Sequence, residues 1–270
     1  MSGWDDPDTA AQYDAFSREH GMYRETSRDL AELARIEHAA LVVDLACGTG
    51  VTTEVILARV GAGTTVIALD GSRAMLDVAR SRITDPRVRW VCAPAVELAS
   101  FASEADAIIC NSAFWQLEMA PTSVAAGKAL RSGGRLVFNL SRAMISAALT
   151  AADPRPTKPM LTQLMHAVAV LEYDYVPPHP ATRRGTPLTP EGLAEMQRQA
   201  GLEPAEPQAF EYDTSPEAQL AWLRVPIFAN NVLPGLPHAS QMAALDQAYA
   251  RYDKISGREN RWLAFVAVKP

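Results

Sequence analysis

The 270-residue chain is long enough for one large domain, or for a domain with an added lid, around a sizeable core. Hydrophobic residues make up 48% of it and charged residues 21%, which is typical of a soluble globular enzyme and excludes extensive disorder. The net charge of -6 argues against a nucleic-acid binder, because neutralising phosphates requires clustered positive charge.

The sequence shows neither a signal peptide nor an apolar run of membrane-spanning length, so we expect a cytoplasmic protein with no membrane partner. Cys47, Cys92 and Cys110 have no paired spacing and are expected to be buried free thiols in a reducing compartment. The local groups of arginines are expected to lie on a solvated surface: Arg80, Arg82, Arg87, Arg89, Arg183 and Arg184.

Apolar side chains recur at roughly helical spacing over residues 8–38, with a break near Gly21. This pattern predicts an N-terminal helical cover, which we assign to residues 1–38. The apolar stretch from Leu41 to Leu45 then ends abruptly at Gly48-Thr49-Gly50. It predicts a strand buried on both faces, a tight glycine turn and a helix that starts at once.

A glycine turn of this kind brings bare backbone N–H groups, at the positive end of a helix, against a ligand. The next strand, Thr65–Leu69, ends in Asp70, whose carboxylate can accept two hydrogen bonds from a ribose diol. A dinucleotide fingerprint would need a third glycine where Thr53 stands. Asp44 adds a carboxylate near the end of a buried strand, which would repel a pyrophosphate and attract the ammonium and sulfonium groups of S-adenosylmethionine (SAM).

The stretch Asp44–Gly50 resembles the first motif of the class I SAM-dependent methyltransferases of the small-molecule type. Leu69–Ser72, together with Met75, Leu76 and Ala79, resembles their second motif. The resemblance covers about residues 40–141. It implies a Rossmann-like α/β fold: a seven-stranded, mostly parallel sheet with helices on both faces, an antiparallel last strand and helical lid insertions.

The resemblance also implies SAM as cofactor, S-adenosylhomocysteine as product and no metal. The residues expected to bind the cofactor lie in the cover, in the glycine turn and at strand ends: Tyr13, Asp44, Ala46, Gly48, Gly50, Asp70, Gly71, Ser72, Met75, Ala95, Val96 and Asn111. Pro94 stands where the family usually has an aspartate that contacts the adenine. This departure leaves backbone atoms around Ala95 and Val96 as its partners.

After a core of residues 39–141, prolines and methionines punctuate residues 142–188. We interpret this segment as a helical lid, with a helical addition that only covers the sheet as the alternative. Residues 189–270 are expected to complete the sheet, with a helical insertion at about 214–256, so that the chain forms one domain overall. We place the sixth strand at residues 205–213.

Methyl transfer from a sulfonium depends mainly on alignment and exclusion of water. We expect a small-molecule substrate, apolar or aromatic, with O-methylation favoured over N- or C-methylation; a homodimer is compatible with the sequence. The expected pocket residues are Phe114, Trp115, Gln116, His166 and Trp222, although these aromatic residues are also compatible with the core.

A general base is not identified by the sequence, and the weak candidates are His20, His166, Tyr13 and Tyr23. For the two histidines a structural hydrogen bond is the favoured interpretation, and the two tyrosines are equally compatible with covering the core. In the family a histidine often stands where this chain has Gln116. Two other functions remain open: a catalytically silent SAM-binding protein and an NAD(P)-linked Rossmann oxidoreductase. An RNA or protein methyltransferase is disfavoured by the acidic charge.

Overall fold

The computed structural model describes residues 3–145, 160–178, 188–252 and 258–270. The chain begins with a short 3-10 turn, η1 (Gly3–Asp5), and two helices, α1 (Pro7–Glu19) and α2 (Met22–Ala34). Gly21 separates the two helices, at the break that the sequence predicted.

Strands of the described residues form one sheet in the order β3-β2-β1-β4-β5-β8-β6, with β7 also paired to β8. Their bounds are β1 (Leu41–Leu45), β2 (Thr65–Asp70), β3 (Val88–Cys92), β4 (Ala105–Cys110), β5 (Leu130–Ser141), β6 (Glu203–Pro204), β7 (Gln208–Thr214) and β8 (Arg258–Val268). The strands β1 to β5 are parallel, whereas β8 runs antiparallel to β5, β6 and β7. The predicted Rossmann-like fold class is therefore confirmed.

The sheet has eight strands in the described residues where seven were predicted. The additional strand is the two-residue β6, which ends just before the sixth predicted strand, residues 205–213; that predicted strand corresponds to β7. Pro204 and Pro207 lack the amide hydrogen that a continuous ladder with β8 would use. Both short strands nevertheless keep the antiparallel pairing with β8.

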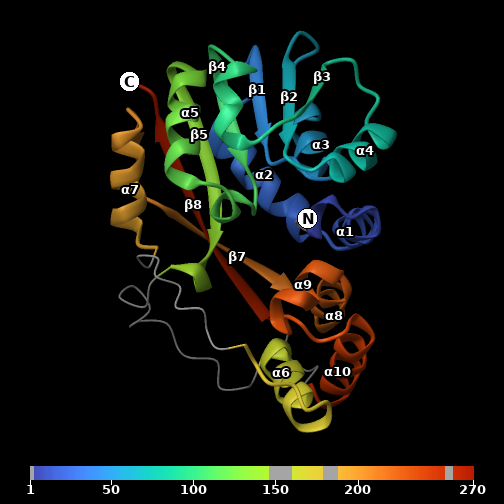
Figure 1. Ribbon diagram of the computed structural model, residues 1–270. Helices are drawn as coiled ribbons and strands as arrows, with labels where there is room; N and C mark the ends of the chain where they lie inside the picture. Colours follow the sequence, from blue (N-terminus) through green and yellow to red (C-terminus); the bar gives the residue numbers. More distant parts are fainter. Residues whose placement is uncertain (1–2, 146–159, 179–187, 253–257) are drawn as a thin grey trace.

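Helices cover both faces of the sheet (Figure 1). One apolar layer packs α2 and α3 (Val51–Leu57) against residues such as Val42 and Val66. The other packs α5 (Met119–Ala129), α7 (Pro190–Gln199) and the 3-10 segment η2 (Ala95–Ser100) against the opposite face. The helix α4 (Arg73–Arg82) follows β2 and is capped by Ser72, whose hydroxyl accepts a hydrogen bond from the amide of Met75 at 3.2 Å.

Four helices form a separate apolar cluster beyond the sheet, which we call the helical lobe: α6 (Leu161–Glu172), α8 (Pro216–Arg224), α9 (Pro226–Val232) and α10 (His238–Arg251) (Figure 1). The lobe combines parts of both predicted insertions, because α6 comes from residues 142–188 and the other three from residues 214–256. Residues 146–159 and 179–187 of the proposed lid lie outside the described residues, so the lid stays a prediction.

Two predictions about side-chain exposure are wrong. Cys92 is exposed, because it ends β3 at the edge of the sheet, whereas Cys47 and Cys110 are buried. Arg82 and Arg87 are not solvated: their side chains are only 14% and 23% exposed, since each lies against carboxylates. In the described part of the chain, no helix is both long and apolar enough to cross a membrane.

Candidate functional site

The residues between β1 and α3 form a tight bend, which we call the glycine loop (residues 46–50). Ala46, Gly48 and Gly50 have φ values of 56°, 53° and 91°, in the left-handed region that glycine adopts readily. A β-carbon on Gly48 would lie 3.8 Å from the ring of Tyr13, so the loop backbone directly faces this side chain. The bend ends at Gly50, which is the N-cap of α3 and has no side chain to cap the amides of the first helical turn.

Asp70 lies at the end of β2 beside the glycine loop. Its carboxylate accepts hydrogen bonds from the amides of Gly48 and Ser72, each at 2.8 Å. Desolvation raises the pKa of Asp70, although these two amide hydrogen bonds oppose the shift. Each carboxylate oxygen has a second acceptor site, so the group can bind two further donors such as ribose hydroxyls.

Asp44, on the neighbouring strand β1, is 1% exposed and accepts a hydrogen bond from the Thr53 hydroxyl at 2.6 Å. Burial raises the pKa of Asp44 to about 7; the Thr53 hydrogen bond lowers it and the nearby charge of Asp70 raises it further. A cation placed between the two acids would favour their charged forms. The local electrostatics are therefore those of a site for a positively charged ligand.

Thr49 supplies a further sign of a ligand. Its side-chain hydroxyl is buried within the glycine loop and has no hydrogen-bond partner among the described residues. A buried hydroxyl without a partner costs free energy that a bound polar group would recover. This orphaned hydroxyl, the bare Gly48 backbone and the two acids together fit the methionine and ribose parts of SAM.

Aromatic side chains gather over the glycine loop and Val51; we call them the aromatic cover: Trp4, Tyr13, Phe16, Tyr23, Trp222 and Phe228. They come from the N-terminus and from α8 and α9 of the helical lobe. The rings of Trp222 and Phe228 are stacked, with centroids 4.1 Å apart. The ring centroid of Tyr13 lies 5.7 Å from that of Tyr23 and 6.3 Å from that of Phe228. The structure thus brings Tyr13, Tyr23 and Trp222 together with the glycine loop.

The two tyrosines of the cover are weak proton acceptors. Removal from water raises the pKa of Tyr13 well above its usual value, and its contact with Tyr23 adds to the shift. Desolvation also raises the pKa of Tyr23, although its hydroxyl receives hydrogen bonds from Trp222 and Tyr13. Both phenols are protonated near neutral pH, so they can donate or orient but cannot readily act as bases.

The N-terminus is fastened across the strand ends. The carbonyl oxygen of Trp4 accepts a hydrogen bond from the Ser72 hydroxyl at 2.7 Å, and the Trp4 indole N–H donates to the side chain of Gln116 at 2.8 Å. Gln116 belongs to η3 (Phe114–Gln116), directly after β4. It therefore holds the cover directly after the end of β4.

Asn111 joins the end of β4 to the cover. Its amide nitrogen donates to the Ser27 hydroxyl at 2.9 Å and to the carbonyl of Tyr23 at 3.1 Å, so it fixes α2. Asn139 of β5 donates to the Asn111 side chain at 3.0 Å and accepts from the amide of Ser112 at 2.6 Å. Ser112 has a φ of 55°, a conformation that Asn139 helps to hold.

The other predicted site residues lie further from this centre or in the core. Phe114 is fully buried and stacks on Phe138 at 4.0 Å, which is a core environment. Trp115 is half-buried against the same core, and His166 lies against Tyr175 in the helical lobe. Met75 is buried in the first turn of α4.

Near Asp70, the amide of Ala93 donates to the Asp70 carbonyl at 3.1 Å, which leads the chain into Pro94. Ala95 and Val96 then begin η2. Gly71 has open space around its α-carbon, with the Ala93 carbonyl 3.9 Å from a β-carbon placed there. His20, at the end of α1, lies 5.1 Å from Phe16, and its Nε2 is buried without a partner among the described residues.

Sequence reasoning missed several residues that shape the site: Trp4, Thr49, Asn139 and Arg82. Thr49 stands inside the recognised motif, and its small polar side chain was a usable signal. The others lie far from the motif in sequence, so only the folded chain brings them to it.

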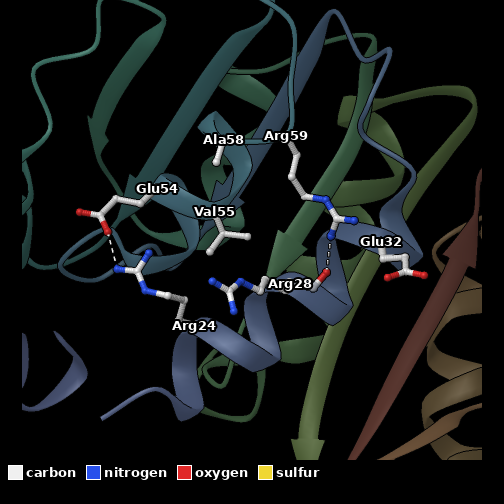
Figure 2. A pocket seen from close by; sticks show the side chains of 7 residues that line it. All are labelled: Arg24, Arg28, Glu32, Glu54, Val55, Ala58 and Arg59. Atoms are coloured by element: carbon white, nitrogen blue, oxygen red, sulfur yellow. Dashed lines mark hydrogen bonds and ion pairs between the residues drawn. The ribbon is translucent and has the colours of Figure 1, made fainter. Parts of the chain in front are cut away.

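A cavity of about 360 Å³ lies elsewhere, between α2 and α3 (Figure 2). Arg24, Arg28 and Arg59 line it, and Figure 2 shows Arg24 paired with Glu54, whose carboxylate is 2.8 Å away. Three guanidinium groups make this cavity unsuitable for a sulfonium. The strand ends, with their two acids, are therefore the better candidate site.

Comparisons with known proteins agree with this geometry. Residues 42–134 match the family model described as a methyltransferase domain. A malonyl-[acyl-carrier protein] O-methyltransferase from Priestia megaterium is 30% identical over 99 residues, which cover 36% of this chain and 35% of that protein. A trans-aconitate 2-methyltransferase from Azoarcus sp. is 32% identical over 145 residues, covering 53% of this chain and 52% of the relative.

Both matches leave a large part of the curated relatives outside the alignment, since the chain spans about a third of one and about half of the other. Among solved structures, the cyclopropane synthase MmaA2 from Mycobacterium tuberculosis has a TM-score of 0.54 at 16% identity, covering 90% of this chain and 83% of that one. This likeness concerns the fold.

Proposed function

We propose that this chain, whose residues 42–134 match the model of a methyltransferase domain, is a class I SAM-dependent methyltransferase that acts on a small apolar or aromatic metabolite. O-methylation is the favoured reaction, with N- or C-methylation as alternatives. The observation that carries the proposal is the position of Asp44 and Asp70 on neighbouring strands beside the glycine loop, where the buried Thr49 hydroxyl has no hydrogen-bond partner in the described part of the chain.

When bound, SAM supplies a methyl group that its sulfonium charge already activates for displacement. The chain's own residues then have three tasks. Backbone amides of the glycine loop and the Thr49 hydroxyl bind polar groups of the donor, while Asp44 complements its positive charge. Asp70 accepts hydrogen bonds from the ribose.

The aromatic cover performs the remaining task, which is exclusion of water and alignment of the acceptor. Trp222 and Phe228 offer a stacked apolar wall, and Tyr13 and Tyr23 offer hydroxyls that can orient a polar group. Alignment in a dry site accounts for a large part of the acceleration of a bimolecular displacement.

For an acceptor that must lose a proton, His20 is the best of the four base candidates. Its Nε2 is buried beside the cover and has no partner among the described residues, whereas the raised pKa values of Tyr13 and Tyr23 disfavour a phenolate. Substituting His20→Gln should then lower kcat for an oxygen acceptor by about 10²-fold or more, the usual range for a general base. Binding of SAM should be unchanged in this variant.

O-methylation is supported by the name of one relative, the malonyl-[acyl-carrier protein] O-methyltransferase. The apolar or aromatic character of the acceptor is supported by the aromatic cover alone. The two names on the relatives, malonyl and trans-aconitate, supply acidic compounds that serve as competing acceptors in a test.

The test begins with calorimetric titration of SAM and S-adenosylhomocysteine into the purified chain. Methyl-labelled SAM is then supplied with phenols, amines and enolisable carbonyls, and separately with a malonyl thioester and trans-aconitate. Transfer to a phenol or another apolar acceptor supports the proposal, whereas transfer only to the acidic compounds, or only to protein or RNA, overturns the acceptor class. Tight binding with no turnover on any acceptor indicates a silent SAM-binding protein; NADH binding without SAM binding indicates an oxidoreductase.

A further inference from the structure

Arg82, the last residue of α4, joins three elements that surround the glycine loop. Its guanidinium donates hydrogen bonds to Asp14 of α1 and to Glu54 of α3, and to the carbonyl of Thr49 in the loop at 3.3 Å. Arg82 and Asp14 are only 14% and 13% exposed. A planar guanidinium with five donors is suited to such a three-way contact, which a lysine could not reproduce.

Further charges extend the contact into an ionic cluster of Asp14, Arg24, Glu54 and Arg82. Arg24 of α2 binds the second oxygen of Glu54 at 2.8 Å, a pair visible in Figure 2. Although burial alone would raise it, the hydrogen bonds from Arg24 and Arg82 hold the pKa of Glu54 below its ordinary value. Partly buried networks of this kind are more effective than isolated surface pairs.

The cluster is coupled directly to the candidate site. Asp14 follows Tyr13 in α1, and Tyr13 is the side chain that faces Gly48. The same guanidinium that binds Asp14 also binds the carbonyl of Thr49. One side chain therefore connects α1, above the candidate site, to the loop below it, whose bend also has the hydrogen bonds from Gly48 to Asp70 and from Gly50 to Cys47.

We propose that Arg82 is a positioning residue that clamps α1 over the glycine loop and thereby sets how long the methyl donor or its product stays bound. This inference rests on the proposed function for its ligand. Tyr13 and Trp4 lie across the loop, so exchange of the ligand requires α1 to move away. Loss of the clamp leaves the loop and both acids in place but lets the cover open more often.

The test uses the full chain with Arg82→Met and Arg82→Lys, and with Arg87→Met as the matched control. Arg87 is also a partly buried arginine, paired with Asp85 at 2.7 Å, and its guanidinium donates to carbonyls at the end of α3 and not to α1. Two quantities are measured: amide hydrogen exchange of residues 7–19 without ligand, and the dissociation rate of S-adenosylhomocysteine by stopped flow.

Arg82→Met should accelerate exchange in residues 7–19 and S-adenosylhomocysteine dissociation by roughly tenfold each, as expected for loss of a charge-assisted contact. Arg82→Lys should give a smaller increase in both, and Arg87→Met should change neither. High salt should accelerate dissociation from the native chain more than from Arg82→Met, because it screens the cluster.

Unchanged exchange in residues 7–19 of folded Arg82→Met would overturn the clamp, whether or not the chain binds the product. Faster exchange with an unchanged dissociation rate would overturn the positioning role. If the native chain binds neither SAM nor its product, the proposed function fails and the positioning role with it, while exchange still shows whether Arg82 holds α1.

Discussion

The glycine loop and the aromatic cover meet at one site but differ in how the chain builds them. The loop and its acids come from residues 44–72, a continuous strand-turn-helix-strand unit. The cover combines Trp4 and Tyr13 with Trp222 and Phe228, which lie about two hundred residues further along the chain. Local backbone geometry therefore determines where the donor can bind, whereas long-range packing determines what can reach it.

The largest expected effect concerns Asp44 and the pH dependence of stability. Its pKa is raised in the folded chain to about 7, so the protonated form is favoured by folding. Protonation of Asp44 therefore contributes to the free energy of unfolding. This contribution is fully present below about pH 4, is lost as pH rises through 7, and amounts to on the order of 4 kcal/mol. Asp44→Asn should abolish this loss in urea unfolding measured from pH 4.5 to 8 without ligand.

Asp106 provides a control of opposite sign. It accepts hydrogen bonds from the amides of Ala40 and Leu41 and from Arg131, which hold its pKa below the ordinary value despite partial burial. The contribution of ionised Asp106 to the free energy of unfolding is present above its ordinary pKa and is lost as pH falls through its pKa in the folded chain. Both of its pKa values lie below pH 4.5, so Asp106→Asn should leave the slope of the profile between pH 4.5 and 8 unchanged. If Asp106→Asn removed the loss of stability in this range as Asp44→Asn does, the electrostatic account of Asp44 would be wrong.

Next in size is the effect of Asp70→Ala on donor binding. Because hydrogen bonds to a charged group are lost, the free energy of SAM binding should weaken by about 1.5–3 kcal/mol in calorimetry. Asp77→Ala, which removes an exposed carboxylate of α4, serves as the control and should leave affinity unchanged. Equal affinity of the native chain and Asp70→Ala would remove Asp70 from the site.

A smaller effect is expected in the cover. Tyr23→Phe removes the hydroxyl that accepts from Tyr13 and Trp222 and should lower the free energy of unfolding by about 1 kcal/mol. Acceptor KM should rise while SAM affinity stays near that of the native chain. Tyr173→Phe is the control: it loses a hydrogen bond from Gln247 in the helical lobe and should lower the free energy of unfolding by a similar amount without changing the acceptor KM. If Tyr173→Phe raised the acceptor KM as much as Tyr23→Phe does, Tyr23 would lie outside the acceptor site.

The smallest effect belongs to Gln116→Ala. The hydrogen bond that Gln116 accepts from Trp4 is exposed, so the free energy of unfolding should change by less than about 0.5 kcal/mol. Trp4 fluorescence should nevertheless shift toward a more solvated signal. If the free energy of unfolding fell by more than about 1 kcal/mol, the exposed hydrogen bond between Trp4 and Gln116 would stabilise the cover more than the packing of its rings does.

The same contrast explains how much the sequence could predict. Gly48, Gly50, Asp70 and the Ser72 cap follow from strand and turn patterns, because each is decided by neighbours within a few residues. The separate strand β6, which ends at Pro204, was missed, although the prolines at positions 204 and 207 gave a local signal.

Other features had no local signal. Arg82 was expected on a solvated surface, since its partners Asp14 and Glu54 lie 68 and 28 residues away in the chain. Phe114 was expected at the pocket, whereas stacking on Phe138 and of Phe138 on Phe265 draws it into the core. These contacts depend on which strands become neighbours, and periodicity along one segment does not contain that information.

The most direct test of the central claim is an amide hydrogen-exchange footprint of S-adenosylhomocysteine on the native chain. If the loop and the cover close on one ligand, exchange should slow in residues 46–53, in residues 70–72 and in residues 7–23 at the same ligand concentration. Absence of any slowing in residues 46–53 at saturating concentration would contradict the assignment of the glycine loop as the donor site.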